Sequence, residues 1–334
     1  VDQLVERIRS VTDAPVHTAI YTHGHVDHAY GLAPYLLPDQ EPPRIIGHVA
    51  MAERFDRYEQ TKRHNYFVNT RQFGGSVELE QLEEGASESF DHFGRSPLPP
   101  DTYYEDELTI EVGGLTFELH HCRGETDDHT WVWCPEREVL APGDLFIWAV
   151  PNGGNPQKFQ RYPWEWADGL RAMAAKRPRS MGSGHGGYVV DDPDKLQRML
   201  VGTADYLSTI CDQALAALEE SSPPHVDVVH AVDLPETDEP WLRPLYDDPE
   251  FLIRSTVRYY GGWYSGRPSE LKPAPRPDLA QAVVGLAGGA AAVAERATAL
   301  YDTDPRVACH LADFALEADP GDPLVQEAVA AVYD

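Results

Sequence analysis

The sequence predicts an α/β domain followed by an all-α domain. Short β-branched runs alternate with helical and loop segments in the first half of the chain, and a Gly-Gly pair at 113–114 joins two strands of alternating polarity. After residue 190 the pattern changes to helical spacing interrupted by Pro-rich breaks. With 334 residues the chain is long enough for two domains, which we expect at 1–190 and 191–334.

The composition excludes several classes of partner. Lys and Arg number 27 against 55 Asp and Glu, which gives a formal net charge of −28. So acidic a surface repels phosphate backbones and anionic membranes, so we expect no nucleic-acid partner. No apolar run approaches the ~20 residues of a membrane-spanning helix, and we expect no integral membrane segment.

The cysteines and the start of the chain bear on its compartment. The four cysteines are widely spaced and form no Cys-x-x-Cys pair, which favours buried thiols and a cytoplasmic location. The chain begins with Val1, so we expect that the native N-terminus is missing, and with it any signal peptide.

A histidine-rich loop carries the predicted chemistry. Residues 16–21 form an apolar, β-branched run typical of a buried strand, and Thr-His-Gly-His-Val-Asp-His follows at 22–28. Alternate side chains of extended backbone point to one side, so His23, His25 and Asp27 converge while the next turn brings His28 alongside. These four side chains suit a pair of metal ions such as Zn²⁺, and they would be costly to hold together without one.

The next elements lead to a second polar loop. Residues 44–48 are predicted to form a strand, and residues 76–100 a loop. The aromatic-rich segment 49–73 is predicted to cover a core; in a second interpretation it is a lid over the metal cleft. Residues 108–112 and 115–119 flank Gly113 and Gly114 as a hairpin. The hairpin leads into residues 121–129, which contain further histidine and carboxylate side chains.

The spacing His-x-His-x-Asp-His resembles the signature of the metallo-β-lactamase superfamily of hydrolases. The resemblance implies an αββα sandwich for residues 1–190, with its first strands missing from this chain, and two Zn²⁺ per chain. It also implies the complete ligand set: one metal is held by His23, His25 and Glu125, the other by Asp27, His28 and His185, and both by Asp144.

Glu125 is the unusual member of that set. Arg-Gly-Glu-Thr at 123–126 stands where most of the superfamily has Pro-Gly-His-Thr, so the resemblance implies a carboxylate in place of the histidine. A carboxylate oxygen binds zinc at much the same distance as an imidazole nitrogen. The alternative is that Glu125 is a solvated loop residue and that His129 or His121 is the ligand.

Residues 148–166 are predicted as a loop beside the metals. Gly, Pro and Asn indicate the loop, and its aromatic and cationic side chains suit a wall for a substrate. The alternative is a surface loop that caps the predicted helix 164–175. The candidate substrate contacts are Asn155, Lys158, Arg161 and Tyr162.

The second half resembles the dimerisation domain of alkyl sulfatases of the metallo-β-lactamase type. The most specific parts are Tyr-Tyr-Gly-Gly-Trp-Tyr-Ser-Gly-Arg-Pro at 259–268 and Ala-Cys-His-Leu-Ala-Asp-Phe-Ala-Leu-Glu-Ala at 308–318. The resemblance implies a homodimer through 191–334. Helices are predicted at 195–218, 277–300, 305–318 and 323–333; taken without the resemblance, they indicate a helix-hairpin array for protein binding.

The resemblance implies a zinc hydrolase of alkyl sulfate esters that uses a metal-activated water, with Asp27 and Asp144 essential and an apolar-chain ester as substrate. Two departures from the family bear on the substrate: Asp144 stands where a bridging glutamate is usual, and a His-Asn-Leu-Tyr-Thr-Leu-Arg-Gly run is absent. The alternatives are a hydrolase of another ester, a lactone, a thioester or a phosphodiester, and a non-catalytic dimeric binding protein.

Overall fold

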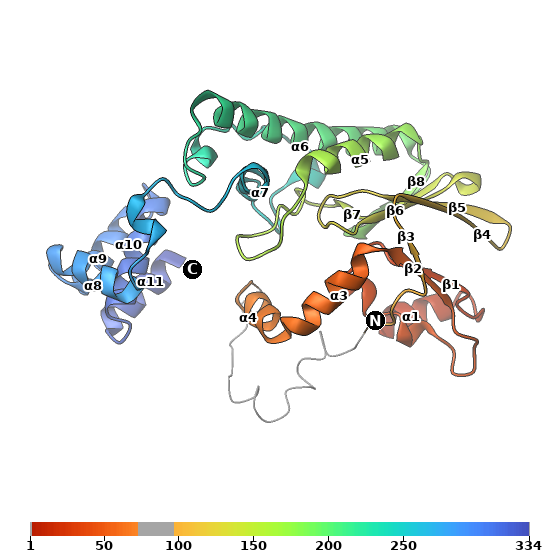
Figure 1. Ribbon diagram of the computed structural model, residues 1–334, viewed down its shortest axis with the longest axis horizontal. Helices are drawn as coiled ribbons and strands as arrows, with labels where there is room; N and C mark the ends of the chain where they lie inside the picture. The colour runs from red at the N-terminus through yellow and green to blue at the C-terminus, as the bar shows by residue number, and fades with distance from the viewer. Residues whose placement is uncertain (1, 73–96, 334) are drawn as a thin grey trace. The chain divides into compact units, whose positions relative to one another are not determined.

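The structure is a computed structural model that describes residues 2–72 and 97–333 (Figure 1). It divides into two compact units, of which the first ends at Trp263 and the second begins at Tyr264. The loop expected at 76–100 lies outside the described residues up to residue 96.

Two sheets form the centre of the first unit. The smaller sheet is parallel and has the strand order β1 (Thr18–Ile20), β2 (Arg44–His48) and β3 (Thr102–Tyr104). The larger sheet is antiparallel except for the parallel β7–β8 pair. Its strands, in order, are β4 (Glu107–Val112), β5 (Leu115–His121), β6 (Thr130–Cys134), β7 (Val139–Ile147), β8 (Ser180–His185) and β9 (Tyr188–Val189).

The predicted hairpin at Gly113 and Gly114 is confirmed as the β4–β5 connection. Both glycines adopt positive φ, 60° and 77°, which a two-residue hairpin turn of this kind requires and which side chains with a Cβ resist. The turn sets the register that pairs Val112 with Leu115 and brings β5 to the start of the second polar loop.

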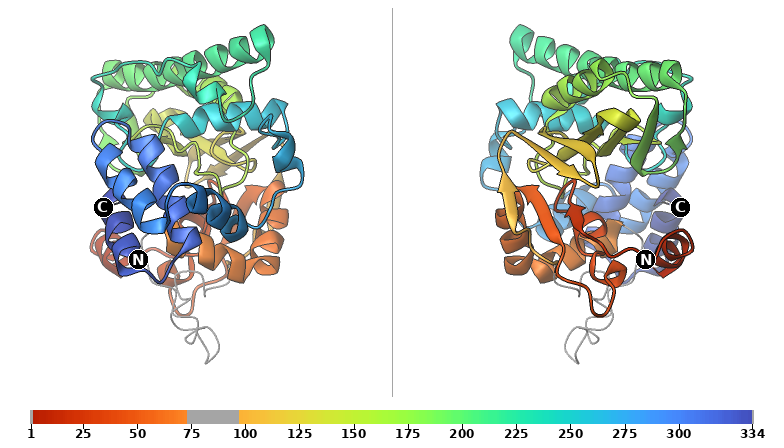
Figure 2. Two further views of the ribbon diagram at one scale, coloured as in Figure 1. Left: turned by 90° about the vertical axis from the view of Figure 1, so that its left-hand side faces the viewer. Right: turned by 90° about the vertical axis from the view of Figure 1, so that its right-hand side faces the viewer.

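Helices cover the outer face of each sheet (Figures 1 and 2). Ile46 and Tyr104 meet Ile110 and Leu119 between the sheets. α5 (Pro163–Ala175) and α6 (Pro193–Ser221) pack on the larger sheet through one large core, and α2 (Val26–Ala29) and α3 (Ala50–Gln60) contribute to the core beside β2. The layers are therefore helix, sheet, sheet and helix, which confirms the expected αββα sandwich followed by a helical part.

The remaining helices of the first unit are α1 (Asp2–Arg9), α4 (Lys62–Gln72) and α7 (Glu250–Tyr260). α7 joins the core of α5 and α6 through Leu252, Ile253 and Val257. This packing carries the first compact unit past residue 190, to Trp263. The domain boundary that the sequence predicts at residue 190 therefore stays a prediction.

The second unit consists of α8 (Arg276–Leu286), α9 (Ala290–Leu300), α10 (Pro305–Ala318) and α11 (Pro323–Tyr333). The prediction of one helix over 277–300 was wrong, because Gly288 and Gly289 adopt φ of 94° and 107° and break it in two. Short 3₁₀ helices lie at Ala33–Tyr35, Pro135–Arg137, Val228–His230, Pro240–Leu242 and Pro268–Leu271.

Within the described residues, no single helix has both the length and the apolar composition of a membrane span. Taken together, α8 and α9 meet both criteria, with a bend of 85° between them.

The inter-sheet core offers a test of the sandwich. Leu119 is fully buried, so Leu119→Ala should lower the free energy of unfolding by about 2–5 kcal/mol. All seven tryptophans lie at or before residue 263, so their fluorescence during urea unfolding reports the first unit. Leu4, 61% exposed, gives the matched control Leu4→Ala, which should change stability by less than about 0.5 kcal/mol. Equal effects of the two substitutions would contradict the assigned core.

Candidate metal centre

The histidine-rich loop starts where β1 ends. Tyr21 still donates its backbone N–H to Ile46 O at 2.9 Å, and the chain then leaves the sheet. His23 is fully buried, and its Nε2 lies 2.9 Å from Nδ1 of His25. α2 begins directly after His25 and carries Asp27 and His28. The loop therefore directs its polar side chains to one point, as the spacing predicts.

Glu125 completes the first group. Its Oε2 lies 3.4 Å from both His23 Nε2 and His25 Nδ1, which is long for a hydrogen bond. That oxygen is buried, and no donor in the described part of the chain reaches it. The other oxygen, Oε1, accepts a hydrogen bond from Asn152 Nδ2 at 2.6 Å. A buried carboxylate oxygen between two imidazole nitrogens and without a donor fits a cation.

The second group joins α2 to the end of β8. His28 Nε2 and His185 Nε2 lie 3.1 Å apart, and Asp27 Oδ2 lies 3.3 Å from the first and 3.2 Å from the second. The parallel pairing of β8 with β7 brings His185 to the loop that follows β1, 157 residues earlier in the chain.

Asp144 on β7 lies between the two groups. Its Oδ2 is 3.3 Å from His28 Nε2, 3.2 Å from His185 Nε2 and 4.0 Å from His23 Nε2. Its Oδ1 is buried, and no described residue donates to it. Gly184 permits this arrangement, because a Cβ at that position would lie 2.0 Å from Asp144 Oδ1.

The carboxylates of Asp27 and Asp144 give the second group negative charge that positive charge must balance. Burial opposes ionisation of Asp27, but hydrogen bonds from His185 and His28 outweigh it and lower the pKa of the carboxyl. Asp144 behaves in the same way. Hydrogen bonds to Asp144 and Asp27 raise the pKa of His185 to about 10. Burial lowers the pKa of His28, but the same two carboxylates outweigh it and raise that pKa to about 10. Without a cation, imidazole protons balance the carboxylates.

The first group differs from the second because the pKa of one of its histidines is lowered. Burial, together with the neighbouring histidines, holds the pKa of His23 well below its ordinary value, so its imidazole is neutral at physiological pH. Neutral imidazole is the form that ligates a metal. The pKa of Glu125 is also lowered, because His25 and Arg161 outweigh the effect of its burial.

The donor set fits metal ions. Two clusters have ligand atoms within 4.8 Å of one another, one formed by His23, His25, Glu125 and Asp144 and the other by Asp27, His28 and His185. Nitrogen and carboxylate donors without a thiolate suit Zn²⁺ among the common biological metals.

The two alternative ligands have other partners. His129 stacks on His23, with ring centroids 4.5 Å apart, and its Nε2 accepts a hydrogen bond from the backbone N–H of Asp144 at 3.1 Å. His121 stacks on His48 at 3.7 Å and bonds the backbone oxygen of Asp127. The carboxylate of Glu125, and neither of these two histidines, thus joins the ligand nitrogens of His23 and His25 in one cluster.

A buried ion pair supports the first loop. Asp128 Oδ2 accepts a hydrogen bond from Gly24 N–H at 2.8 Å and lies 3.1 Å from Arg54 Nε on α3. Both side chains are almost fully buried. Sequence reasoning did not single out Arg54, because α3 is rich in charged residues and nothing in its local pattern marks one arginine as buried.

A cavity of about 920 Å³ opens onto the metal-ligating groups. Apolar side chains form part of its wall, among them Ile147, Trp148, Phe159 and Leu245. α3 and α4 add Tyr58, Asn65, Val68 and Asn69. The segment 49–73 therefore covers a core with Met51 and Phe55 and also lines the cavity.

Two of the four predicted substrate contacts line this cavity. Lys158 Nζ donates to Asn69 Oδ1 at 2.9 Å. Arg161 is almost fully buried, donates to the backbone oxygen of Glu125, and has NH2 3.6 Å from Glu125 Oε1. The charge of Arg161 therefore faces Glu125, a candidate metal ligand.

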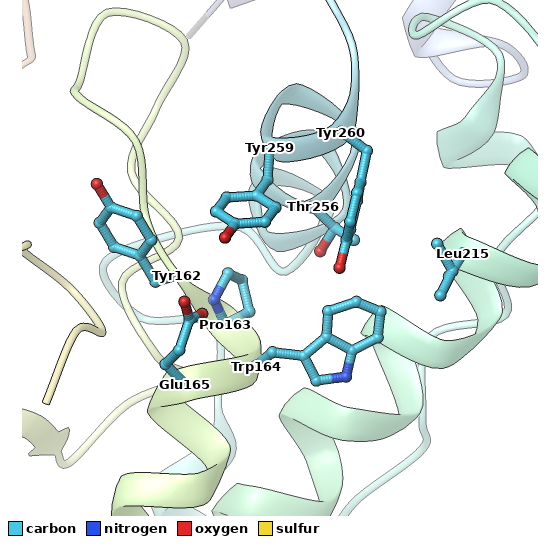
Figure 3. Close-up of a pocket in the computed structure, with 8 residues that line it drawn as sticks. All are labelled: Tyr162, Pro163, Trp164, Glu165, Leu215, Thr256, Tyr259 and Tyr260. Carbon is cyan, nitrogen blue, oxygen red and sulfur yellow. The ribbon is translucent and has the colours of Figure 1, made fainter.

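Asn155 and Tyr162 do not line this cavity, and their role as substrate contacts stays a prediction. The Asn155 side chain accepts a hydrogen bond from Gln157 N–H within a local turn. Tyr162 directly precedes α5. It lines a separate aromatic pocket (Figure 3).

Comparisons with known families agree with this geometry. A family model described as metallo-beta-lactamase superfamily matches residues 2–185, and one described as alkyl sulfatase dimerisation matches residues 225–334. The resemblance recognised in the sequence is thereby confirmed.

Individual relatives have low identity to the chain. It is 26% identical to a linear primary-alkylsulfatase of Pseudomonas sp. (strain ATCC 19151), over 97% of this chain and 64% of the relative. It is 24% identical to an (R)-specific secondary-alkylsulfatase of Pseudomonas sp., over 92% of this chain and 49% of the relative. The chain thus spans less than two thirds of the length of either relative.

A solved structure shares the fold. The stereoselective inverting sec-alkylsulfatase Pisa1 from Pseudomonas sp. superposes with a TM-score of 0.80 at 19% identity, over 98% of this chain and 54% of that chain.

Two glycines of β8 test the centre. Gly184→Ala should displace Asp144 and lower the bound zinc per chain, because the new Cβ would meet its Oδ1. Gly182→Ala is the matched control, since no atom of the described residues lies within 4 Å of a Cβ built there. Zinc retained after dialysis, measured by elemental analysis, distinguishes the two. Equal retention in both variants would contradict the role given to Asp144.

Proposed function

The chain belongs to the metallo-β-lactamase superfamily, and on that premise we propose that it is a dinuclear zinc hydrolase of alkyl sulfate esters. The observation that carries the proposal is the pair of metal-ligating clusters beside one cavity that has an apolar wall. The names of the relatives, which are alkylsulfatases, support the choice of substrate class.

In this proposal His23, His25 and Glu125 hold one Zn²⁺, Asp27, His28 and His185 hold the other, and Asp144 serves both. When bound, the two ions supply the Lewis acidity that activates water for attack at neutral pH. The chain keeps the ligands in position before substrate arrives. His129 fixes the Asp144 backbone, while Asn152 and Arg161 hold Glu125.

Lys158 is the proposed contact for the sulfate group. Arg161 is engaged with Glu125, so its charge is already balanced by a carboxylate. Lys158 lines the same cavity, is partly buried, and has only the neutral amide of Asn69 as its hydrogen-bond partner among the described residues. An ammonium group with a neutral partner can add a charge-assisted hydrogen bond to an anion.

The apolar wall is the proposed contact for the alkyl chain. Ile147, Trp148, Phe159 and Leu245 come from two segments, 147–159 and the residues before α7. Phe159 is 47% exposed and Leu245 is 73% exposed, so each has apolar surface that a substrate can cover. Burying each methylene of a chain contributes about 0.8 kcal/mol.

We also propose that the chain self-associates through residues 191–334. The match of residues 225–334 to the alkyl sulfatase dimerisation model supports this. On α8, Leu279, Val283 and Leu286 follow helical spacing and are 49%, 37% and 92% exposed, which leaves an apolar stripe for a second copy to cover.

A different ester remains the second candidate. Residues 145–161 contain no histidine, so the loop after Asp144 lacks the residue that would protonate a leaving alcohol in the family pattern. A lactone and a phosphodiester therefore belong in the substrate panel.

Sulfate release by the zinc-loaded chain is the direct test. We expect release from linear alkyl sulfates to rise with chain length, because the apolar wall binds added methylenes, and to vanish in Asp144→Ala. A lactone and a phosphodiester serve as controls. Turnover of a control alone would overturn the substrate class and leave the hydrolase, whereas wild-type turnover by zinc-loaded Asp144→Ala would overturn both.

Lys158→Gln tests the sulfate contact. The substitution removes a charged hydrogen-bond donor, so KM for an alkyl sulfate should rise by about 10- to 100-fold while the zinc content stays unchanged. Lys62→Gln, at an exposed position of α4, is the matched control and should leave KM unchanged. A KM for Lys158→Gln equal to that of the control would show that another group binds the sulfate.

A further inference from the structure

A second pocket, of about 290 Å³, lies apart from the metal cavity (Figure 3). Tyr162 precedes α5, Trp164 and Glu165 belong to its first turn, and Tyr259 and Tyr260 end α7. Figure 3 shows Tyr260 reaching from α7 toward Trp164, and Tyr259 pointing toward Pro163 and Glu165. The proposed hydrolysis uses none of these side chains.

The aromatic rings stand nearly perpendicular to one another. Trp164 and Tyr260 have centroids 5.8 Å apart at 78°, and Tyr259 and Tyr260 have centroids 5.0 Å apart at 81°. Tyr162 adds a fourth ring, 6.2 Å from Tyr259 at 79°. Rings that stand perpendicular to one another around one space can direct their faces, which carry partial negative charge, into that space. This is the arrangement of an aromatic cage.

A carboxylate that is paired with an arginine also lines the cage. Glu165 Oε1 accepts a hydrogen bond from Arg123 NH2 at 2.5 Å, and no described residue donates to its other oxygen. The Arg123 guanidinium also lies 4.6 Å over the Tyr162 ring. Arg123 therefore balances much of the charge of Glu165, and a second cation would meet the remaining ring faces together with the second oxygen of Glu165.

The open side of the pocket leaves these rings accessible. Tyr259 is 46% exposed and Tyr260 is 52% exposed within the chain. Trp164 and Leu215 add apolar surface below them. A bare metal ion has too few donors here, since Glu165 is the one carboxylate in the lining, and an anion would meet the negative ring faces.

We propose that this pocket binds an organic ammonium ion, with Trp164, Tyr259 and Tyr260 around the alkylated nitrogen and the second carboxylate oxygen of Glu165 beside it. A quaternary ammonium group is weakly hydrated and apolar at its surface, so it loses little on entering an aromatic site. The net charge of −28 adds a long-range attraction for cations. The proposal stands independently of the sulfatase assignment.

The pocket shares one segment with the metal centre. Tyr162 donates its backbone N–H to Gly124 O at 2.9 Å, and Arg123 and Gly124 directly precede Glu125. Arg161 and Tyr162 thus approach the Glu125 segment from opposite sides, one in the metal cavity and the other in the aromatic pocket. An ammonium ion in the pocket would lie outside the cavity that is proposed for the substrate.

Choline is the probe, and 3,3-dimethylbutan-1-ol is its neutral isostere. Binding to the full zinc-loaded chain is followed from the methyl resonance of each probe by NMR at constant physiological ionic strength. We expect saturable choline binding at least about fivefold tighter than that of the isostere. Trp164→Ala and Tyr260→Ala should each weaken choline binding about fivefold, and two variants guard against a failure of one to fold.

Tyr188→Ala is the matched control, because Tyr188 is 77% exposed on β9 and lies outside the pocket. It should bind choline as the wild type does. Equal affinity for choline and the isostere would overturn recognition of charge. The absence of saturable choline binding, or unchanged binding in both Trp164→Ala and Tyr260→Ala, would overturn the site.

Discussion

The structure depends on the crowding of four imidazoles and three carboxylates into one volume, which is mostly buried around Glu125 and more exposed around Asp27 and His185. Such a set is unfavourable by itself, because carboxylate oxygens of Glu125 and Asp144 are buried without hydrogen-bond donors. Protons on His28 and His185 offset part of the charge, and a pair of divalent cations would offset the rest. The surrounding fold serves to hold these groups together against their repulsion.

The αββα sandwich provides the necessary rigidity. Ligating residues come from the loop after β1, from β7 and from the end of β8, so two sheets packed through Leu119 and its neighbours fix their separation. Close approach sets a further constraint, since only a residue without a Cβ fits at Gly184 beside Asp144. The Asp128–Arg54 pair ties the first loop to α3 from behind. Packing and electrostatics therefore act on the same few backbone segments.

The region after β7 contributes to two different environments. Arg161 enters the metal cavity and holds Glu125, whereas Tyr162 turns to an aromatic pocket that also contains Glu165. The two pockets have opposite character: one combines metal-ligating groups with Lys158 and an apolar wall, the other combines ring faces with a carboxylate. Chemistry at the first and recognition of a cation at the second can therefore coexist in one chain.

The sequence by itself determined the fold class, the β4–β5 hairpin and the convergence of His23, His25, Asp27 and His28, because strand alternation, turn chemistry and the His-x-His-x-Asp-His spacing are local properties. Glu125, Asp144 and His185 were expected only from the resemblance to the metallo-β-lactamase superfamily. Tertiary structure alone decided the role of Arg54, the different directions of Arg161 and Tyr162, and the packing of α7 in the first unit. These features depend on contacts between residues far apart in the chain, which no local pattern records. The break between α8 and α9 depends on both. Gly288 and Gly289, which permit the break, are visible in the sequence, whereas the positive φ that they adopt follows from the packing of α8 and α9.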